Sequence, residues 1–541
     1  MAKPFAITLD VGSSLANRTG SWRQERPVYV HRLPPCNDAC PAGENIQQWL
    51  YLAEDGSYEA AWRQIMRDNP LPAVMGRACF HPCQTACNRA TVDEAVGINS
   101  IERFLGDRAL AEGWDPDPPA PDSGQRVLVV GSGPGGLSAA YHLRLLGHQV
   151  VVFEASSLPG GMMRYGIPSY RLPRDVVAAE IERIGALGVE IVCDHRVDDL
   201  AAAMEEGGFD AAFLAVGAQR GKHVDIPAGD SARILDAVTL LHGTEAGEPP
   251  ELGRRVVVYG GGDTAMDAAR TARRLGATDA VVVYRRTRER MPANAEEVRD
   301  AVEEGVQLKW LSTIAGVDDA GLTIERMELD ADGFPRPTGE LEQLPADSVV
   351  LALGQSADLS LVRTTPEIEV GGELVAVGPD MMTAHPGIFA GGDVVAGART
   401  LTEAVGHGKK AARAIDAWLG QRSAPAPDRH PLAGPEQLNT WYYADAPQAV
   451  RQRLDAARRT STFDEVVHGL DESTALFEAR RCMSCGNCFQ CDNCFGVCPD
   501  NAVIKVDEGH GYRFDYDFCK GCGLCVQECP CGAIEMVPEE I

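Results

Sequence analysis

Short apolar runs alternate with segments of helical periodicity through the middle of the chain, over residues 126–420. The runs RVLVV at 126–130 and RVVVY at 255–259 each lead into a glycine-rich turn and then a helical pattern. Such alternation predicts parallel sheets with helices on both faces. Helical patterns also cover residues 44–68 and 446–481. The pattern therefore predicts an α/β centre with helical segments on either side of it.

Two proline-rich stretches interrupt this pattern. WDPDPPAPDSGQ occupies residues 114–125, and RSAPAPDRHPLAGPEQ occupies residues 422–437. Both compositions disfavour helix and strand, so we interpret both stretches as linkers. They divide the 541 residues into an N-terminal region, the α/β middle and a C-terminal region.

Composition narrows the class of protein. Apolar residues make up 45% of the chain, enough for a large core. No run of about 18 apolar residues is present, which predicts no membrane span. The start, MAKPFAITLDVGSSLANRTG, lacks a basic segment followed by an apolar one, which predicts no signal peptide. The net charge of −28 argues against nucleic-acid binding and favours a partner with a locally basic face, although a solvated acidic surface explains most of it.

Sixteen of the 17 cysteines lie near the two ends of the chain, five over residues 36–87 and eleven over residues 482–531. The C-terminal group contains the run C-x-x-C-x-x-C-x-x-x-C-P twice. In such a pair, three close thiolates hold one 4Fe–4S cluster and the fourth cysteine of the run reaches the other cluster. The two predicted ligand sets are Cys488, Cys491, Cys494 and Cys529, and Cys519, Cys522, Cys525 and Cys498.

Zinc and disulfides are the alternatives for these cysteines. Pairs of the form C-x-x-C also bind zinc, and many cysteines can indicate disulfides, although these are typical of small secreted domains. A large chain without an export signal favours metal chemistry in the cytoplasm. The repeated ferredoxin spacing favours iron–sulfur clusters over zinc, and such clusters transfer one electron at a time.

The first glycine-rich turn has the dinucleotide-binding pattern G-x-G-x-x-G, formed by Gly131, Gly133 and Gly136. The first glycine makes the tight turn, the second lets a pyrophosphate approach the backbone, and the third allows close helix packing. The next strand pattern, VVVFE, ends on Glu154, at about the position expected for an acceptor of a ribose hydroxyl.

The second turn is a G-x-G-x-x-A variant that begins at Gly260 and Gly262 and continues through Asp263 and Thr264. The strand pattern after it, AVVVYRR, ends on arginines where an NAD-binding chain carries an acid. Arginine there accommodates the 2′-phosphate of NADP, so we predict NADP(H), with NAD(H) as the alternative. A solvated basic loop is the other interpretation of these residues, which are Arg285, Arg286, Arg288 and Arg290.

Several longer motifs resemble one family. LPGGMMRYGIPSYRLP at 158–173, YGGGDTAMD, YRRTRERMPA and GIFAGGDVVAGARTLTEAVGHGKKAA resemble the glutamate synthase small-subunit family of NADPH-dependent FAD/iron–sulfur flavoproteins. The resemblance covers residues 30–420, and the ferredoxin-like tail is an addition to the family plan. It implies FAD contacts from Gly131, Gly133, Gly136, Glu154, Gly161, Met162, Arg171, Gly392, Asp393 and Thr402. It implies NADP contacts from Gly260, Gly262, Asp263, Thr264, Arg285, Arg286 and Arg290, with residues 351–354 as the strand that closes that side.

The N-terminal cysteines depart from the family, because the leading C-x-x-C of its first motif is missing. The resemblance implies one cluster on Cys40, Cys79 and Cys83, with Glu102 at the place of a non-cysteine ligand. EARRCMSCGNC at 478–488 is similar to the missing opening. We therefore expect a further cluster on Cys36, Cys87, Cys482 and Cys485; the alternative is that it is lost, which leaves three clusters. We expect Cys193 to be a small buried residue and Cys531 to lie beside a cluster.

The expected fold class is α/β, with two Rossmann-like domains for FAD and NADP, an N-terminal helical iron–sulfur domain and a C-terminal ferredoxin-like domain with two 4Fe–4S clusters. The expected boundaries are 1–120 for the helical domain, 121–253 and 351–421 for the two parts of the FAD domain, 254–350 for the NADP domain, 422–481 for a linker with a helical segment, and 482–541 for the ferredoxin-like domain.

These features predict an electron-transfer flavoprotein without a catalytic side chain of its own. NADPH would give a hydride to FAD, and single electrons would pass through the clusters to ferredoxin or an iron–sulfur partner subunit in a hetero-oligomer. The alternatives are the small subunit of a glutamate synthase and a wiring subunit, without turnover of its own, of a 2-oxoacid, aldehyde or aromatic acyl-CoA oxidoreductase. A pyrimidine reductase would need a further FMN barrel domain, and the residues after 421 leave no room for one.

Overall fold

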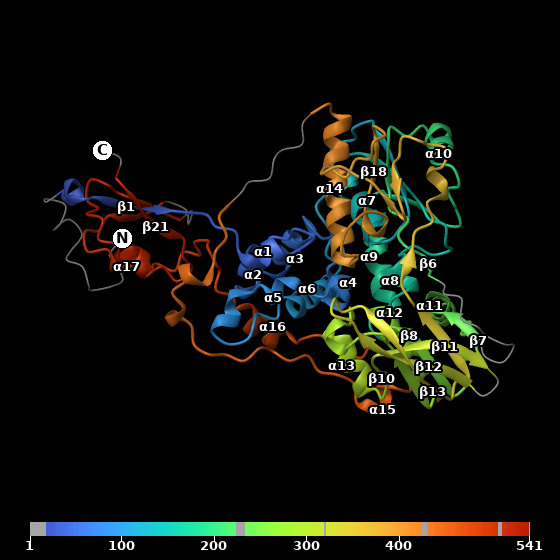
Figure 1. Cartoon of the computed structure of the whole chain (residues 1–541). Coiled ribbons are helices and arrows are strands. Elements are labelled where there is room, and N and C mark those ends of the chain that lie inside the picture. Colours follow the sequence, from blue (N-terminus) through green and yellow to red (C-terminus); the bar gives the residue numbers. More distant parts are fainter. Residues whose placement is uncertain (1–17, 223–232, 319–320, 423–429, 507–510, 540–541) are drawn as a thin grey trace.

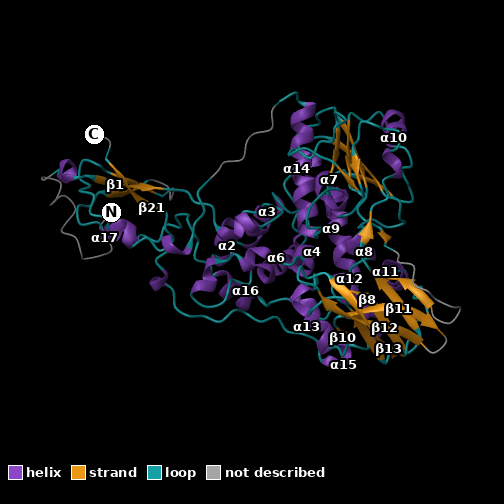
Figure 2. Cartoon of the chain, in the orientation of Figure 1, coloured by secondary structure: helices purple, strands orange, loops and turns teal. Residues whose placement is uncertain are grey.

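A computed structural model describes residues 18–222, 233–318, 321–422, 430–506 and 511–539. The molecule is elongated (Figure 1). The C-terminal module lies at one end, the N-terminal helices lie in the middle, and the two α/β domains lie at the other end. Figure 2 shows that sheets occur at both ends and that the middle is mainly helical. Residues 1–17, most of the stretch in which we expect no signal peptide, lie outside the described residues. Residues 423–429, part of the second predicted linker, also lie outside them.

The first α/β domain contains a five-stranded parallel sheet, as the apolar runs predict. Its strand order is β18-β5-β2-β3-β4, with β2 in the centre. Apart from their first residues, Arg126 and Gln149, strands β2 and β3 are apolar and largely buried, as in a sheet covered on both faces. Helix α14 packs along α7. The bounds are β2 Arg126–Val130, β3 Gln149–Phe153, β4 Glu190–Val192, β5 Ala211–Leu214, β18 Ile388–Ala390, α7 Pro134–Leu145, α9 Arg174–Ala186, α10 Leu200–Gly207 and α14 Leu401–Leu419.

The second α/β domain has a parallel sheet of order β10-β9-β8-β14-β7. Alternate residues of β8 face opposite sides: Val256 and Val258 pack on α12, whereas Val257 packs on an antiparallel sheet of β11, β12 and β13. The sequence predicts helices on both faces of this sheet. That prediction is wrong, because the antiparallel sheet covers one face. The bounds are β7 Arg233–Asp236, α11 Ala237–Glu245, β8 Arg255–Gly260, α12 Asp263–Arg274, β9 Asp279–Val283, α13 Ala295–Glu303, β10 Gln307–Lys309, β11 Ser312–Asp318, β12 Gly321–Leu329, β13 Pro335–Leu344 and β14 Ser348–Ala352.

The N-terminal region forms a helical domain around a core that includes Trp49, Trp62 and Leu71. The helical pattern over 44–68 gives two helices, because the chain turns at Gly56, whose φ of +78° favours glycine. The bounds are α1 Pro35–Ala39, α2 Ile46–Glu54, α3 Tyr58–Met66, α4 Pro72–Ala78, α5 Pro82–Thr85 and α6 Ile98–Glu112.

The C-terminal module includes a strand from the other end of the chain. Strand β1, Glu25–Tyr29, pairs antiparallel with β21, Ile534–Pro538, and Tyr29 stacks on Phe514. The two ends of the chain therefore meet in one small sheet. The other elements of the module are α17 Asn493–Val497, β19 Val503–Lys505, β20 Tyr512–Phe514 and α18 Leu524–Gln527.

The remaining elements are short. The helices are α8 Met162–Tyr165, η1 Thr19–Trp22, η2 Asn88–Thr91, η3 Arg288–Arg290, η4 Ser360–Val362, η5 Gly392–Val394, η6 Pro435–Gln437 and η7 Thr440–Tyr442. The strands are β6 Arg220–Gly221, β15 Gln355–Ser356, β16 Val370–Gly371 and β17 Leu374–Val375. No helix in the described ranges is both long enough and apolar enough to cross a bilayer.

The connecting segment, residues 439–481, runs from the C-terminal module along both other parts of the molecule (Figure 1). The prediction of helix over residues 446–481 is mostly wrong. Only α15, Ala456–Arg459, and α16, Glu472–Ala479, are helical in this range. The rest is extended because it is fixed by contacts with other domains. Glu465 forms ion pairs with Arg77 at 2.8 Å and Arg103 at 2.9 Å, and Arg459 with Glu303 at 2.9 Å.

Glu478 anchors this segment on the N-terminal domain. Its buried carboxylate accepts hydrogen bonds from the Gly97 and Ala449 backbone N–H groups and pairs with Arg481 at 2.6 Å. Both side chains of the ion pair are almost fully buried, with exposed fractions of 0% and 2%. Removal of the Glu478 carboxylate leaves the Gly97 and Ala449 N–H groups without their acceptor, and of its ion pairs Arg481 keeps only that with Asp93 at 3.0 Å; such losses at a buried ion pair are strongly destabilising.

Glu478→Ala is therefore expected to destabilise the docking of this segment by about 3–5 kcal/mol. The measurement is amide hydrogen exchange over residues 446–487, which should accelerate strongly. Glu472→Ala is the matched control: Glu472 lies in the same helix, its side chain is 60% exposed, and its ion pair with Arg108 should contribute little. Equal exchange in the two variants would contradict this account.

Candidate functional site

A cavity in the first α/β domain has a volume of about 530 Å³, a size typical of cofactor sites. All the residues expected to contact FAD line it except Gly136 and Thr402. The expected residues in its wall are Gly131, Gly133, Glu154, Gly161, Met162, Arg171, Gly392 and Asp393. The sequence motifs, which span more than 250 residues, are thus brought together around one cavity.

The three glycines of the first turn have distinct geometric roles. Gly131 has φ +101°, and a Cβ there would lie 2.5 Å from the Ala215 carbonyl oxygen. A Cβ at Gly136 would lie 1.9 Å from the Gly131 carbonyl oxygen, so this glycine allows the helix to approach the turn. A Cβ at Gly133 would meet no atom within 4 Å and would occupy the cavity itself. Gly133 caps α7, whose free N–H groups face this space, and the arrangement fits a pyrophosphate.

Glu154 lies directly after β3, where the sequence predicts an acceptor for a ribose hydroxyl. Its carboxylate accepts backbone hydrogen bonds from Ser132 at 2.9 Å and Ser156 at 2.8 Å, so its position in the cavity wall is fixed. The Ser132 hydroxyl also donates to this carboxylate and accepts from the Gly160 backbone N–H. Ser132 occupies the variable second position of the motif, so the sequence pattern alone does not identify it as a residue that positions Glu154.

The late glycine motif and the start of α14 form another wall of the cavity. Thr400 caps this helix by accepting from the Glu403 backbone N–H, and both Thr400 and Leu401 line the cavity. The positive end of the helix dipole therefore faces the cavity, as expected. Gly392 donates its N–H to His407 Nδ1 at 3.2 Å, and burial raises the pKa of the neighbouring Asp393.

Thr402 does not line this cavity, which corrects the expectation that it faces the flavin. Its hydroxyl donates to Cys79 Sγ at 3.0 Å instead. The expectation was wrong because consecutive residues of a helical turn point in different directions. Leu401 faces the FAD cavity, whereas Thr402 faces the neighbouring cysteines.

The second glycine-rich turn has the same geometry as the first. A Cβ at Gly260 would lie 2.2 Å from the Ala352 carbonyl oxygen, and one at Gly262 would meet no atom within 4 Å. Gly262 caps α12, so free N–H groups again face open space. Asp263 and Thr264, at the start of this helix, line the FAD cavity. The two nucleotide-binding turns therefore converge on one space. Strand β14 covers residues 351–352 of the predicted closing strand and pairs with β8.

The arginines after β9 differ in their contacts. Among the described residues, no carboxylate forms an ion pair with Arg285 or Arg286, and Arg286 Nε is buried without a hydrogen-bond partner. Arg290 instead donates to the Gly333 carbonyl oxygen, and its own carbonyl accepts from Tyr284. Arg285 and Arg286 thus keep their charge available for a phosphate, whereas Arg290 is held by the β12–β13 turn.

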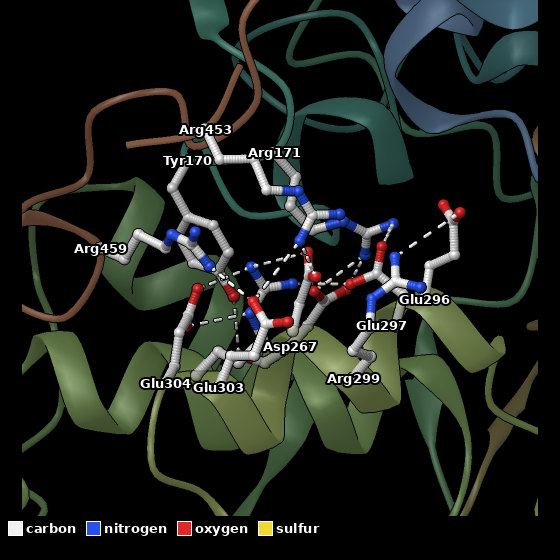
Figure 3. Close-up of polar contacts among 12 residues, drawn as sticks. Tyr170, Arg171, Asp267, Glu296, Glu297, Arg299, Glu303, Glu304, Arg453 and Arg459 are labelled. Carbon is white, nitrogen blue, oxygen red and sulfur yellow. Dashed lines mark hydrogen bonds and ion pairs between the residues drawn. The ribbon is translucent and has the colours of Figure 1, made fainter. Parts of the chain in front are cut away.

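A cluster of ion pairs joins the two α/β domains (Figure 3). Arg171, from the first domain, pairs with Asp267 at 2.7 Å and with Glu297 at 2.8 Å, both from the second domain. Arg270 pairs with Glu297 at 2.7 Å and Glu304 at 2.9 Å. Arg171 lines the FAD cavity, as expected, but its charge is used to orient the NADP domain.

A second cavity is lined by Cys40, Cys79, Cys83 and Glu102, the four residues expected to hold the first N-terminal cluster. Asn69 donates to Glu102 at 2.8 Å and fixes its carboxylate. Residues 78–80 contribute to both cavities, because Ala78 and Phe80 line the FAD cavity and Cys79 lines the other.

The C-terminal module brings its cysteines together in two groups. Cys498, Cys519, Cys522 and Cys525 line one cavity. The sulfurs of Cys488, Cys491, Cys494 and Cys529 lie close enough to interact electrostatically. Cys531 Sγ lies 3.8 Å from Cys529 Sγ, beside this second group.

A further cavity is lined by Cys36, Cys87, Cys482 and Cys485. The remaining cysteine, Cys193, is partly exposed, which corrects the expectation that it is buried; it follows the edge strand β4. In the part of the chain that the structure describes, no three His, Cys, Asp or Glu side chains are arranged to hold a single metal ion.

Comparison with known proteins identifies the family. The model described as pyridine nucleotide-disulphide oxidoreductase matches residues 125–408, the two domains that form the FAD cavity. The chain belongs to this family. Residues 24–114 match dihydropyrimidine dehydrogenase domain II, 4Fe-4S cluster, and residues 512–535 match a 4Fe-4S binding domain. The prediction of iron–sulfur clusters is therefore confirmed for both regions, and the zinc and disulfide alternatives are wrong.

Three curated relatives bear the names of subunits of different oxidoreductases. The NADP(+)-dependent formate dehydrogenase subunit beta of Moorella thermoacetica is 36% identical over 83% of this chain and 70% of its own length. The NADPH-Fe(3+) oxidoreductase subunit beta of Geobacter sulfurreducens is 33% identical over 85% and 77%. The glutamate synthase [NADPH] small chain of Escherichia coli is 34% identical over 71% and 89%. The family and the two turns make this chain an FAD-dependent NADPH oxidoreductase with 4Fe–4S clusters.

Proposed function

We propose that the chain is the NADPH-oxidising subunit of a larger oxidoreductase and transfers electrons to a partner through its C-terminal module. The observation on which this rests is that consecutive residues line the two cavities: Ala78 and Phe80 line the FAD cavity, and Cys79, between them in the chain, lines the first cysteine cavity. When bound, FAD supplies the conversion of a two-electron hydride transfer into the single electrons that clusters accept.

The protein positions the nucleotides. The N-termini of α7 and α12 offer backbone N–H groups to the two pyrophosphates, and Glu154 accepts from a ribose hydroxyl. Arg285 and Arg286 bind the 2′-phosphate of NADPH. The Arg171 ion pairs with Asp267 and Glu297 hold the NADP domain so that both nucleotide turns face one cavity.

The electron exit is the C-terminal module, at the far end of the molecule from the FAD domain (Figure 1). Cys488, Cys491 and Cys522 are exposed there. Trp441, 67% exposed, stacks on Tyr442 beside this module and offers an apolar contact for a partner. Two relatives are named as beta subunits, which favours a hetero-oligomer with an iron–sulfur oxidoreductase subunit; a free ferredoxin is the other acceptor.

Two other functions remain to be separated from this one. Similarity to the glutamate synthase small chain supports an amide-transferring complex, which would require a second chain. A wiring subunit would conduct electrons without oxidising NADPH itself. Purified chain should reduce both an artificial dye and a 2×4Fe–4S ferredoxin with NADPH under anaerobic conditions. Absence of dye reduction in FAD-loaded chain would favour the wiring function, and dye reduction without ferredoxin reduction would contradict the proposed exit.

A further inference from the structure

Four cysteines from opposite ends of the chain surround one cavity between the N-terminal helices and the C-terminal module. Cys36 and Cys87 come from the N-terminal domain, and Cys482 and Cys485 follow α16. We propose that these four thiolates hold a further 4Fe–4S cluster, which joins the two ends of the chain. The iron–sulfur family models match residues 24–114 and 512–535, so neither includes the second pair.

The cavity surrounds the four sulfurs with a mainly apolar wall. Its polar residues are Gln47, Asn88 and Arg89. The burial of a cluster and the charge beside it are two of the factors that set its reduction potential. The rest of the wall includes apolar residues, such as Leu50 and Ile98.

The second cysteine pair is rigidly placed. Arg481, directly before Cys482, pairs with Asp93 at 3.0 Å and donates to the carbonyls of Glu94 and Ala95 at 2.6 and 2.9 Å. Directly after Cys485, Gly486 donates its N–H to the Cys531 carbonyl at 2.6 Å and accepts from the Arg32 N–H at 3.2 Å. The pair is thus fixed on both sides, by the N-terminal domain and by the C-terminal module.

The position of this cavity makes it a link between the two groups of clusters. Ile98 lines both this cavity and the cavity of Cys40, Cys79 and Cys83. Tyr443 donates to the carbonyl of Met483, between Cys482 and Cys485, at 3.2 Å, and Gly486, directly after Cys485, donates to the carbonyl of Cys531 in the C-terminal module at 2.6 Å. A cluster here would therefore lie between the FAD-proximal cluster and the Cys488 group.

The redox step is a one-electron relay in which no bond is formed or broken. The four cysteines would hold a group that could accept one electron from the site on Cys40, Cys79 and Cys83 and pass one to the Cys488 group, with NADPH as the reductant. The relay rests on the proposed function, whereas the ligand assignment does not. Iron content therefore tests the site even if electrons prove to leave by another route.

The experiment counts iron and acid-labile sulfide in the anaerobically purified full chain. Four cubane clusters require about sixteen of each per chain, and three require about twelve. Cys482→Ser with Cys485→Ser should remove about four of each, and so should Cys36→Ser with Cys87→Ser. Because both pairs hold one cluster, the fourfold variant should also lose only about four. Cys193→Ser, a cysteine outside every cavity, is the control and should lose none.

The iron counts distinguish one cluster shared by the two cysteine pairs from separate clusters or from no cluster. A wild-type chain with about twelve irons, or pair variants with unchanged iron, would overturn the proposal. Losses that add up to about eight in the fourfold variant would also overturn it, because the two pairs would then belong to different clusters. Spectroscopy gives a second readout: both pair variants should lose the same reduced-cluster EPR signal, and loss of two different signals would contradict a shared site. The wild-type count needs no variant and decides the matter even if the variants fold poorly.

Discussion

Cys519→Ser combined with Cys522→Ser should lower NADPH-dependent reduction of the acceptor protein by more than about 100-fold, equivalent to about 2.7 kcal/mol of added barrier. The two cysteines line the cavity of the outermost ligand group, and Cys522 is exposed. Their loss removes a cluster from the exit of the relay, while the FAD cavity at the other end of the molecule is unchanged (Figure 1). Dye reduction by NADPH should therefore be largely retained. The measurement compares dye and ferredoxin reduction rates in the same preparation.

Cys193→Ser is the matched control, because Cys193 follows β4 in the FAD domain and belongs to none of the four cysteine groups described above. It should leave both rates near those of the wild type. If the Cys519/Cys522 variant reduced ferredoxin at the wild-type rate, the C-terminal module would not be the exit. If dye reduction fell as far as ferredoxin reduction, the module would support the fold of the FAD domain instead.

Arg285→Ala combined with Arg286→Ala should raise KM for NADPH strongly and change KM for NADH little. Each lost charge-assisted phosphate contact costs about 1.5–3 kcal/mol, so one contact corresponds to roughly 10- to 150-fold. Neither arginine forms an ion pair with a described carboxylate, so the substitutions disrupt no internal contact of that kind. Steady-state dye reduction with each nucleotide measures the effect.

Arg326→Ala removes an arginine of the same domain and serves as the control for net charge. Its side chain is 69% exposed and its ion pair with Glu340 spans 3.5 Å, so the free energy of nucleotide binding should change little. A wild-type chain that used NADH and NADPH equally well would contradict the assignment of the 2′-phosphate to these arginines. So would an Arg285/Arg286 variant in which both nucleotides weakened alike.

Local patterns made much of the site predictable. Gly133 and Gly262 are helix caps at which the absence of a Cβ atom leaves open space. Because a nucleotide needs this space, glycine is required at these positions and the sequence motif shows it directly. The predicted strands before each turn form the central sheets, since apolar runs of this length between helices are buried on both faces. The cysteine spacing similarly indicated which thiols could share a cluster.

Contacts between distant segments were not predictable in the same way. The pairing of β1 with β21 depends on residues more than 500 positions apart, and neither strand shows which partner it has. The sequence pattern of the connecting segment predicts helix, yet Glu465 lies in a non-helical part of it and is held by ion pairs with Arg77 and Arg103 of the N-terminal domain. Tertiary contacts outweigh helix propensity there, because propensity contributes less than about 1 kcal/mol per residue. The role of Thr402 was missed because sequence spacing alone did not resolve which cavity its side chain faces.

The central claim is that electrons from NADPH enter the clusters through the FAD cavity and reach the C-terminal module. Anaerobic rapid-freeze EPR after mixing the wild-type chain with NADPH tests it most directly, with the Cys519/Cys522 variant in parallel. We expect reduced-cluster signals in the wild type within the time of one dye-reduction turnover. In the variant, only the signal of the C-terminal module should be lost. NADPH that reduced the flavin but left every cluster oxidised would contradict it.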